Sequence, residues 1–216
     1  MRDISGLQLF KNVEFWVLFV IYFFCAGGSL MFLNNIGVMG EALNESDSVQ
    51  SNLVIIYSVG NCVGRVGMGF LTDLISKKLS KFWCVVLSSS IIAVTHLVTA
   101  FALHPMLYPA TILTGIGYGG MVSIMVSLAF VRFGARRFGF NFGVLAISSA
   151  ASALIFSTFS GKIYDHLSSQ AEGGVCYGSH CFQISHIISF VTNTVCIFLG
   201  IFLVYYNKKL LLKRKQ

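Results

Sequence analysis

Seven polar residues lie within or at the ends of long apolar runs, where their side chains are suited to bind a small solute through hydrogen bonds and charge. They are Asn34, Asn35, Tyr57, Asn61, Arg65, His96 and Tyr118. Arg65 is the strongest candidate, because an unpaired cation among apolar residues is costly in a membrane and is often functional. It also precedes Asp73 by about two helical turns, which suits a structural anchor. Solute binding and anchoring therefore both remain open for Arg65.

Three of these residues have simple structural interpretations as well. Asn34 and Asn35 end the first apolar run, and they either cap a closely packed helix or form a polar wall of a solute path. His96 is either a hydrogen-bonded buried histidine or a proton-coupling group, since imidazole titrates near neutral pH. The sequence has no Ser-His-acid arrangement, phosphate-binding loop or convincing metal cluster. It therefore argues against an enzyme and predicts neither a cofactor nor a metal centre.

Cys176 and Cys181 differ from the other cysteines because they lie in a polar loop, close to His180. A disulfide that closes a small loop is expected on an oxidising side of a membrane. Zinc binding by the two cysteines and His180 competes with it, although a structural zinc site normally takes four ligands and the fourth is not apparent. The remaining cysteines are expected to be small apolar packing residues. They are Cys25, Cys62, Cys84 and Cys196.

Membrane-spanning helices are the elements that must position these residues. Of the 216 residues, 56% are hydrophobic and only 11% are charged, whereas about a quarter of a soluble domain is charged. The net charge of +7 arises from short basic clusters between apolar runs. This pattern indicates membrane topology and argues against a nucleic-acid partner.

The apolar runs are long enough for helices that cross a bilayer, which require about 20 residues each. They are continuous and do not alternate, so the sequence predicts an all-α polytopic membrane protein and not a barrel. The first run is too long for a cleavable signal peptide. We expect six spans, at residues 15–35, 52–72, 82–103, 106–130, 140–163 and 183–206.

Lysine and arginine predict the orientation. With both ends of the chain in the cytoplasm, 13 of the 15 basic residues lie on the cytoplasmic side, as the positive-inside rule requires. Residues 1–14 then form a cytoplasmic segment, 15–206 the transmembrane bundle, and 207–216 a basic cytoplasmic tail. The chain is thus expected to be a multi-pass protein of the lipid bilayer, in a plasma membrane or an endomembrane.

Glycines and charges around the second span carry a family resemblance. Gly69, Asp73, Lys77 and Lys78 occupy the positions of the cytoplasmic loop signature G-x-x-x-D-[RK]-x-G-[RK]-[RK], with Leu74 and Ser76 as departures. The segment resembles the signature of major facilitator superfamily transporters. Further stretches are similar to the C-terminal six-helix half of the nodulin-like branch of that superfamily. They are Gly28–Gly37, Gly64–Arg65, Phe133–Gly143, Tyr164–Asp165 and Cys176–Phe182.

The resemblance implies a secondary transporter of two six-helix bundles that moves a small solute by alternating access. This chain would supply one bundle, and its partner would be a missing N-terminal half or a second copy. It is then a fragment of a longer protein, a half-size protein that dimerises, or a degenerate paralogue. A coupling proton is a further expected partner, while the resemblance names no solute.

Arg132 and Arg136 lie in a short basic loop that either anchors the topology or forms a cytoplasmic latch with Asp73. Such a pair, broken as the transporter changes state, would bias a balanced equilibrium. Two other functions compete with transport. One is a non-transporting membrane scaffold. The other is a six-helix haem protein, which is disfavoured because only His96 lies clearly deep in a span and haem ligation between helices needs paired histidines.

Overall fold

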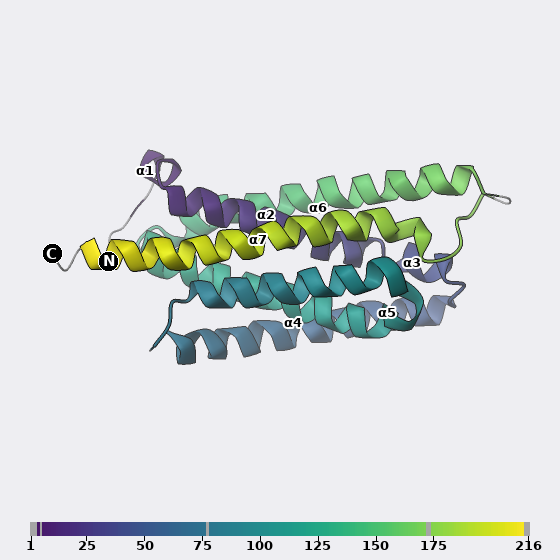
Figure 1. Ribbon diagram of the computed structural model, residues 1–216, viewed down its shortest axis with the longest axis horizontal. Coiled ribbons are helices and arrows are strands. Elements are labelled where there is room, and N and C mark those ends of the chain that lie inside the picture. The colour runs from purple at the N-terminus through teal and green to yellow at the C-terminus, as the bar shows by residue number, and fades with distance from the viewer. Residues whose placement is uncertain (1–3, 5, 77, 172–173, 214–216) are drawn as a thin grey trace.

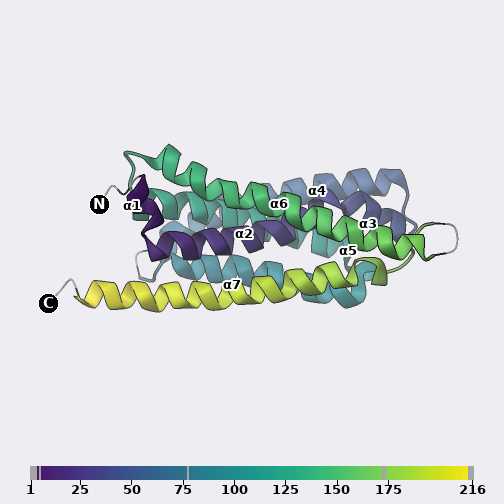
Figure 2. The same ribbon diagram turned by 90° about the horizontal axis from the view of Figure 1, so that it is seen from above.

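The computed structural model describes residues 4, 6–76, 78–171 and 174–213, and every element among them is a helix. The chain folds into an elongated helical bundle (Figures 1 and 2). The helices are α1 (Leu7–Phe10), α2 (Val13–Asn34), α3 (Ile36–Ala42), α4 (Asp47–Ile75), α5 (Phe82–Phe133), α6 (Phe138–Ser169) and α7 (His180–Lys213). Five of them are long and apolar enough to cross a membrane, namely α2, α4, α5, α6 and α7. The predicted all-α, multi-pass membrane protein is thus confirmed.

Helix α5 is 52 residues long and is bent back on itself at Ala102, whose backbone angles are not helical. Pro105 follows three residues later, and a proline clashes with the carbonyl four residues before it, here that of Phe101. The arm before the bend (82–101) runs antiparallel to the arm after it (103–133) (Figure 1). The contact between Lys81 Nζ and Ser127 Oγ, at 3.1 Å, shows that the start of the first arm lies beside the last part of the second. Where we expected two spans at 82–103 and 106–130, the structure has one helical element with a sharp bend.

Glycines allow α4 to pack closely against the second arm of α5. A Cβ atom added at Gly60 would lie 2.6 Å from the Ile112 carbonyl oxygen, and one at Gly115 would lie 2.5 Å from that of Tyr57. Gly64 and Gly119 meet the opposite backbone even more closely. Each helix therefore presents a pair of glycines four residues apart, the arrangement that lets helix backbones approach in lipid.

The connections gather at two ends of the bundle. Helix α1, the α4–α5 turn, the α5–α6 turn and the C-terminal part of α7 lie at one end, which we call the basic end (Figures 1 and 2). Helix α3, the bend of α5 and the α6–α7 loop lie at the opposite end. The described basic residues in or beside the first group of connections are Lys11, Lys78, Lys81, Arg132, Arg136, Arg137, Lys208 and Lys209.

Burial is uneven among the long helices. In their most apolar windows, 56% of the residues of α2 and of α5 are buried, compared with 28% for α4, 22% for α6 and 28% for α7. Helix α2 contacts α5, α6 and α7, so it lies at the centre of the packing. The apolar faces of α4, α6 and α7 are left uncovered, as expected for surfaces that meet lipid or another bundle.

Candidate functional site

Arg65 stands on an exposed face of α4, where its Nε donates to Asn61 Oδ1 at 2.9 Å. The two residues are four apart, so they lie on the same side of the helix. Among the described residues, no carboxylate lies within salt-bridge distance of the Arg65 guanidinium. Its charge is therefore held in place by Asn61 and is not neutralised by an acid.

Tyrosines from three helices lie in the same region of the bundle as this arginine. Arg65 is close enough to Tyr22 of α2 and Tyr57 of α4 for its charge to act on both phenols, and Tyr22 lies against Tyr118. The Tyr118 hydroxyl is 3.4 Å from Ser149 Oγ of α6. Helices α2, α4, α5 and α6 thus build one polar cluster, which we call the Arg65 face, with Arg65 exposed and Tyr22, Tyr57 and Ser149 buried beneath it. It consists of Tyr22, Tyr57, Asn61, Arg65, Tyr118 and Ser149.

The structure brings four of the predicted path residues together on this face, namely Tyr57, Asn61, Arg65 and Tyr118. Sequence reasoning missed Tyr22 and Ser149. Tyr22 lies in a run of aromatic residues that reads as packing, and Ser149 lies in a run of small residues. The polar ends of their side chains were the only available signal, because their relation to Arg65 depends on how α2 and α6 pack.

The two asparagines that end α2 have separate roles. Asn34 is exposed, and its Nδ2 donates to Ser157 Oγ of α6 at 2.9 Å. Asn35 is buried, and its Nδ2 donates to the Met31 carbonyl of its own helix at 2.9 Å. Asn35 thereby satisfies a backbone carbonyl at the helix end, in line with the capping interpretation, while Asn34 ties α2 to α6.

His96 lies in a fully buried polar cluster between α5 and α7. Its Nδ1 is 2.9 Å from Nδ1 of His186, which is also 3.2 Å from Thr99 Oγ1. Both histidines have no exposed surface. We call this group, together with Ser189 and Asn193 of α7, the histidine cluster.

Gly28 of α2 closes the histidine cluster. A Cβ atom at Gly28 would lie 3.1 Å from both His96 Nε2 and Asn193 Nδ2, so a larger residue would require the cluster to shift by a few tenths of an ångström. Within the described residues, Nε2 of both histidines, Ser189 Oγ and Asn193 Oδ1 have no hydrogen-bond partner. Buried polar atoms are rarely left unsatisfied, so this concentration makes the histidine cluster a candidate site.

The burial of His186 corrects our expectation that only His96 lies deep in a span. The sequence placed His186 near the end of the last span. In the structure α7 already begins at His180, a little less than two turns before His186, so His186 lies inside the bundle. The pair does not suit haem ligation. Its facing Nδ1 atoms are in hydrogen-bond contact, so no metal fits between them.

The latch hypothesis paired Arg132 with Asp73, but the structure pairs Arg132 with Glu14 instead. Its Nε and Nη2 donate to the two carboxylate oxygens of Glu14 at 2.5 and 2.7 Å. The Glu14 side chain is 7% exposed, and a buried carboxylate requires a charged partner far more than the exposed Asp73 does. Pairing of Arg136 with Asp73 stays a prediction.

The signature residues lie at the basic end. Gly69 packs near Ser123 of α5, and Asp73 is exposed close to the end of α4, where its carbonyl accepts from Ser76 Oγ at 2.9 Å. Lys78 is exposed in the α4–α5 turn. Lys77 lies outside the described residues.

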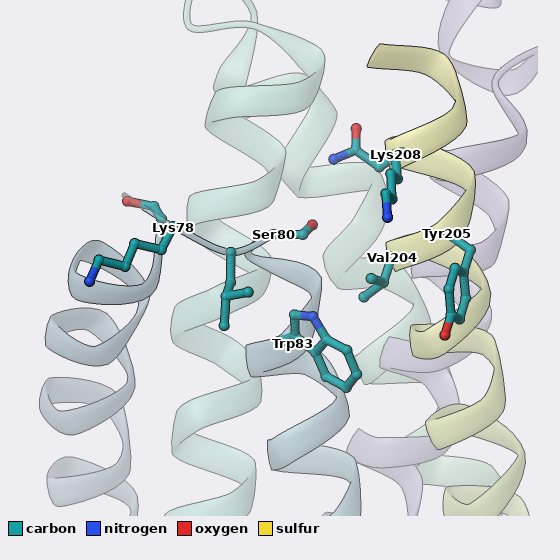
Figure 3. A pocket seen from close by; sticks show the side chains of 9 residues that line it. Lys78, Ser80, Trp83, Val204, Tyr205 and Lys208 are labelled. Atoms are coloured by element: carbon teal, nitrogen blue, oxygen red, sulfur yellow. The ribbon is translucent and has the colours of Figure 1, made fainter. Parts of the chain in front are cut away.

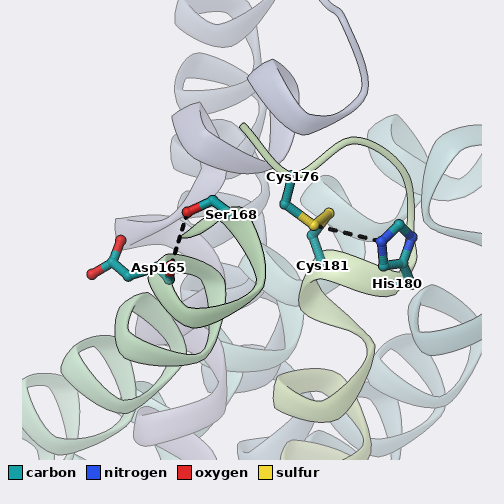
Figure 4. Close-up of a disulfide and its surroundings, with 5 residues drawn as sticks. All are labelled: Asp165, Ser168, Cys176, His180 and Cys181. Carbon is teal, nitrogen blue, oxygen red and sulfur yellow. Dashed lines mark hydrogen bonds between the residues drawn. A yellow bond between two sulfur atoms is a disulfide. The ribbon is translucent and has the colours of Figure 1, made fainter. Parts of the chain in front are cut away.

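Cys176 and Cys181 form a disulfide at the opposite end of the bundle (Figure 4). Nε2 of His180 lies 3.6 Å from Cys176 Sγ. These three residues carry potential ligand atoms within 4.8 Å of one another, but zinc takes thiolates and both sulfurs are used in the disulfide. The loop is also tied to α3, because the Gly178 N–H donates to the Ala42 carbonyl at 2.7 Å.

Comparison with known families assigns the fold. The family model described as NFD4, C-terminal domain, matches residues 2–212. The chain belongs to the NFD4 C-terminal domain family. This confirms the resemblance to the nodulin-like branch of the major facilitator superfamily, and with the long apolar helices it makes the chain an integral, multi-pass membrane protein.

Curated relatives of this NFD4 C-terminal domain are longer proteins. Probable transporter MCH1 of Saccharomyces cerevisiae is 28% identical over 202 residues, which cover 86% of this chain and 42% of the yeast protein. Protein NUCLEAR FUSION DEFECTIVE 4 of Arabidopsis thaliana is 25% identical over 185 residues, covering 81% of this chain and 31% of the plant protein. The chain thus spans less than half the length of these relatives.

Proposed function

We propose that this chain is the C-terminal six-helix half of a secondary transporter that moves a small solute by alternating access. The six crossings are α2, the two antiparallel arms of α5, and α4, α6 and α7. Each arm of α5 is long enough to cross a bilayer of about 30 Å, and the bend at Ala102 lies at the same end as the α6–α7 loop.

We place the basic end in the cytoplasm. The described lysines and arginines of the turns gather there, whereas the disulfide and Glu41 lie near the opposite end. Both the positive-inside rule and the redox preference of disulfides favour this orientation. It gives the N-in, C-in topology expected from the sequence.

The Arg65 face is the observation that carries the proposal. It is the one surface where a cation without an acidic partner stands beside hydroxyls from α2, α4, α5 and α6, among the residues that the structure describes. Arg65 itself is exposed, although an arginine within an apolar span requires a covered or water-filled surrounding. A second six-helix half would enclose this face as the wall of a central path, and the charge of Arg65 favours a solute with an anionic group.

The partner that we propose is an N-terminal half in the same polypeptide. The relatives named transporters are more than twice as long as the matched segment, which supports this arrangement over a second copy of the chain. A non-transporting scaffold is the competing function, and it would show no response to any solute.

Thermal unfolding of the full-length native protein with a library of small carboxylates, phosphates and neutral analogues tests the proposal. We expect anionic compounds to stabilise the wild type, Arg65→Gln to abolish the effect, and Arg65→Lys to retain only part of it because the planar fork is lost. Arg137→Gln, at the basic end, is the matched control. Equal stabilisation of wild type and Arg65→Gln would remove Arg65 from the site, and no stabilisation together with no transport in proteoliposomes would favour the scaffold.

We further propose that a proton is the coupling ion and that the His96–His186 pair receives it. Among the described residues, the side chains in contact with the pair are uncharged: Phe32 on α2, Thr99 on α5, and the adjacent histidine. A proton needs no cavity, which suits the tight packing against Gly28. A proton taken up at the free Nε2 of the donor ring would place a cation among uncharged, fully buried groups, and the cost of burying this cation would bias the balance between transport states.

Cysteine labelling tests this coupling. In a Cys62→Ser background, Asn61→Cys, at a half-buried position of the Arg65 face, reports the accessibility of this face to a water-soluble maleimide at acidic and neutral pH. We expect the labelling rate to change with pH in this background, and the change to be lost in His96→Gln and His186→Gln. His104→Gln, outside the cluster, should keep it, and persistence of the pH effect in both cluster variants would contradict the assignment.

A further inference from the structure

A pocket of about 660 Å³ opens at the basic end between the α4–α5 turn and α7. Ser80 and Trp83 line it from the start of α5, and Asn207 and Lys208 line it from α7. Figure 3 shows the Lys208 ammonium directed into the space between the two elements, on the side of the Ser80 hydroxyl. The Lys78 side chain lines the turn but extends away from Lys208.

The polar groups of this pocket match a phosphate. Lys208 supplies a cation, and Asn207 an amide N–H group. Ser80 Oγ accepts from the Phe82 N–H at 3.5 Å, so the hydroxyl still has its proton to donate to a ligand. None of the described residues that line the pocket is acidic. A cation and neutral donors without a nearby carboxylate favour an anion rich in oxygen atoms.

The remaining wall is apolar and aromatic. Trp83 is 38% exposed and Tyr205 is 65% exposed, and both lie beside the polar groups at the end of apolar helices. Tryptophan and tyrosine are enriched where a bilayer meets water, because their rings accept an apolar and a polar environment together. The ligand is therefore expected to combine a phosphate with an apolar portion.

We propose that this pocket binds the phosphate-bearing headgroup of an anionic lipid, with Lys208 and Ser80 at the phosphate and Trp83 and Tyr205 beside the glycerol and upper acyl region. Basic pockets between membrane helices on the cytoplasmic side are suited to anionic headgroups. The pocket lies away from the Arg65 face, so this site goes beyond solute transport and does not depend on which solute is moved.

Native mass spectrometry of the full-length protein tests the site with phosphatidylserine, phosphatidylinositol 4-phosphate and zwitterionic phosphatidylcholine. We expect the two anionic lipids to bind in preference to phosphatidylcholine. Lys208→Gln should weaken their binding by about fivefold, the effect of one lysine beside an anionic headgroup. Trp83→Leu should weaken lipid binding while leaving the charge unchanged.

Lys209→Gln is the matched control, because it removes the same charge from the adjacent residue, which does not line the pocket. An equal loss in Lys208→Gln and Lys209→Gln would overturn the site in favour of general attraction to the basic end. Competition by inorganic phosphate or glycerol phosphate, with no effect of Trp83→Leu, would overturn the lipid as the source and assign the pocket to a free phosphate. Size-exclusion profiles identical to wild type ensure that each variant is folded.

Discussion

Glu14→Gln tests the ion pair that ties the start of α2 to the end of α5. Both carboxylate oxygens accept from Arg132, at 2.5 and 2.7 Å, and the Glu14 side chain is 7% exposed. The substitution keeps the size of the side chain, removes its negative charge, and leaves the guanidinium without its bidentate acceptor. The cost therefore reports on the charge and not on packing.

The magnitude follows from the burial of the two partners. Removing one member of a buried ion pair costs about 3–5 kcal/mol. The Arg132 side chain is 28% exposed, and its guanidinium carbon lies 5.8 Å from the centre of the Phe82 ring. Water and the aromatic ring can therefore stabilise part of the charge that Glu14→Gln leaves unpaired. We expect Glu14→Gln to lower the free energy of unfolding by about 2–3 kcal/mol. Arg132→Lys should cost less, because the charge remains.

Chemical denaturation of the full-length protein in detergent measures these values. Glu41→Gln is the control, since Glu41 is exposed at the opposite end and surface substitutions change stability by less than about 0.5 kcal/mol. The double variant Glu14→Gln with Arg132→Gln should lose less than the sum of the single changes, because it leaves no unpaired buried charge. A loss for Glu14→Gln no larger than that for Glu41→Gln, or strictly additive single changes, would refute the reasoning.

Three further predictions concern packing, the disulfide and the signature motif. Gly64→Ala should lower the free energy of unfolding by about 1–3 kcal/mol, because the added Cβ would overlap the Ile116 carbonyl. Gly67→Ala is the control: its added Cβ meets nothing within 4 Å, so it should be neutral or stabilising in the same unfolding assay. Equal effects of the two substitutions would contradict the close approach of α4 and α5. Cys176→Ser should lower the free energy of unfolding by about 2 kcal/mol. Maleimide should label Cys176 and Cys181 only after reduction, whereas the exposed Cys62 should react without a reductant. Labelling of all three cysteines without a reductant would rule out the disulfide. Asp73→Asn should shift the balance of inward and outward accessibility if Arg136 is its partner, with Asp165→Asn as a control at the opposite end. Unchanged maleimide labelling of a cysteine at half-buried Asn61 would contradict the latch.

Features that depend on neighbouring residues in the chain were predictable from sequence. The helical, multi-pass architecture follows from uninterrupted apolar runs, because each run must satisfy its own backbone hydrogen bonds in lipid. The sequence also indicates the close packing of α4 and α5. It contains the pairs Gly60 and Gly64, and Gly115 and Gly119, and small residues four apart are typical of a close helix contact. The expected spans at 82–103 and 106–130 placed an interruption close to Ala102, where the structure has its bend, and Pro105 supplies the physical reason.

The gathering of Tyr57, Asn61, Arg65 and Tyr118 was expected only as a set of polar residues at membrane depth. Their common face, and the addition of Tyr22 and Ser149, depend on the rotation of α2, α5 and α6 about their own axes. That rotation is chosen by side-chain packing over the whole bundle, and the apolar pattern of these helices is too uniform to indicate it. Hydrophobicity on all sides of a helix leaves its facing direction undetermined.

The amino-acid sequence by itself thus determined which segments form long apolar helices and which polar side chains within them are costly in a membrane. Only the tertiary structure decided which of them meet. His96 and His186 are 90 residues apart, and Arg132 contacts Glu14 across 118 residues and not Asp73. The physical reason is that a helix forms from contacts within a few residues, whereas the choice of partner for a buried polar group is settled by the packing of all the helices together.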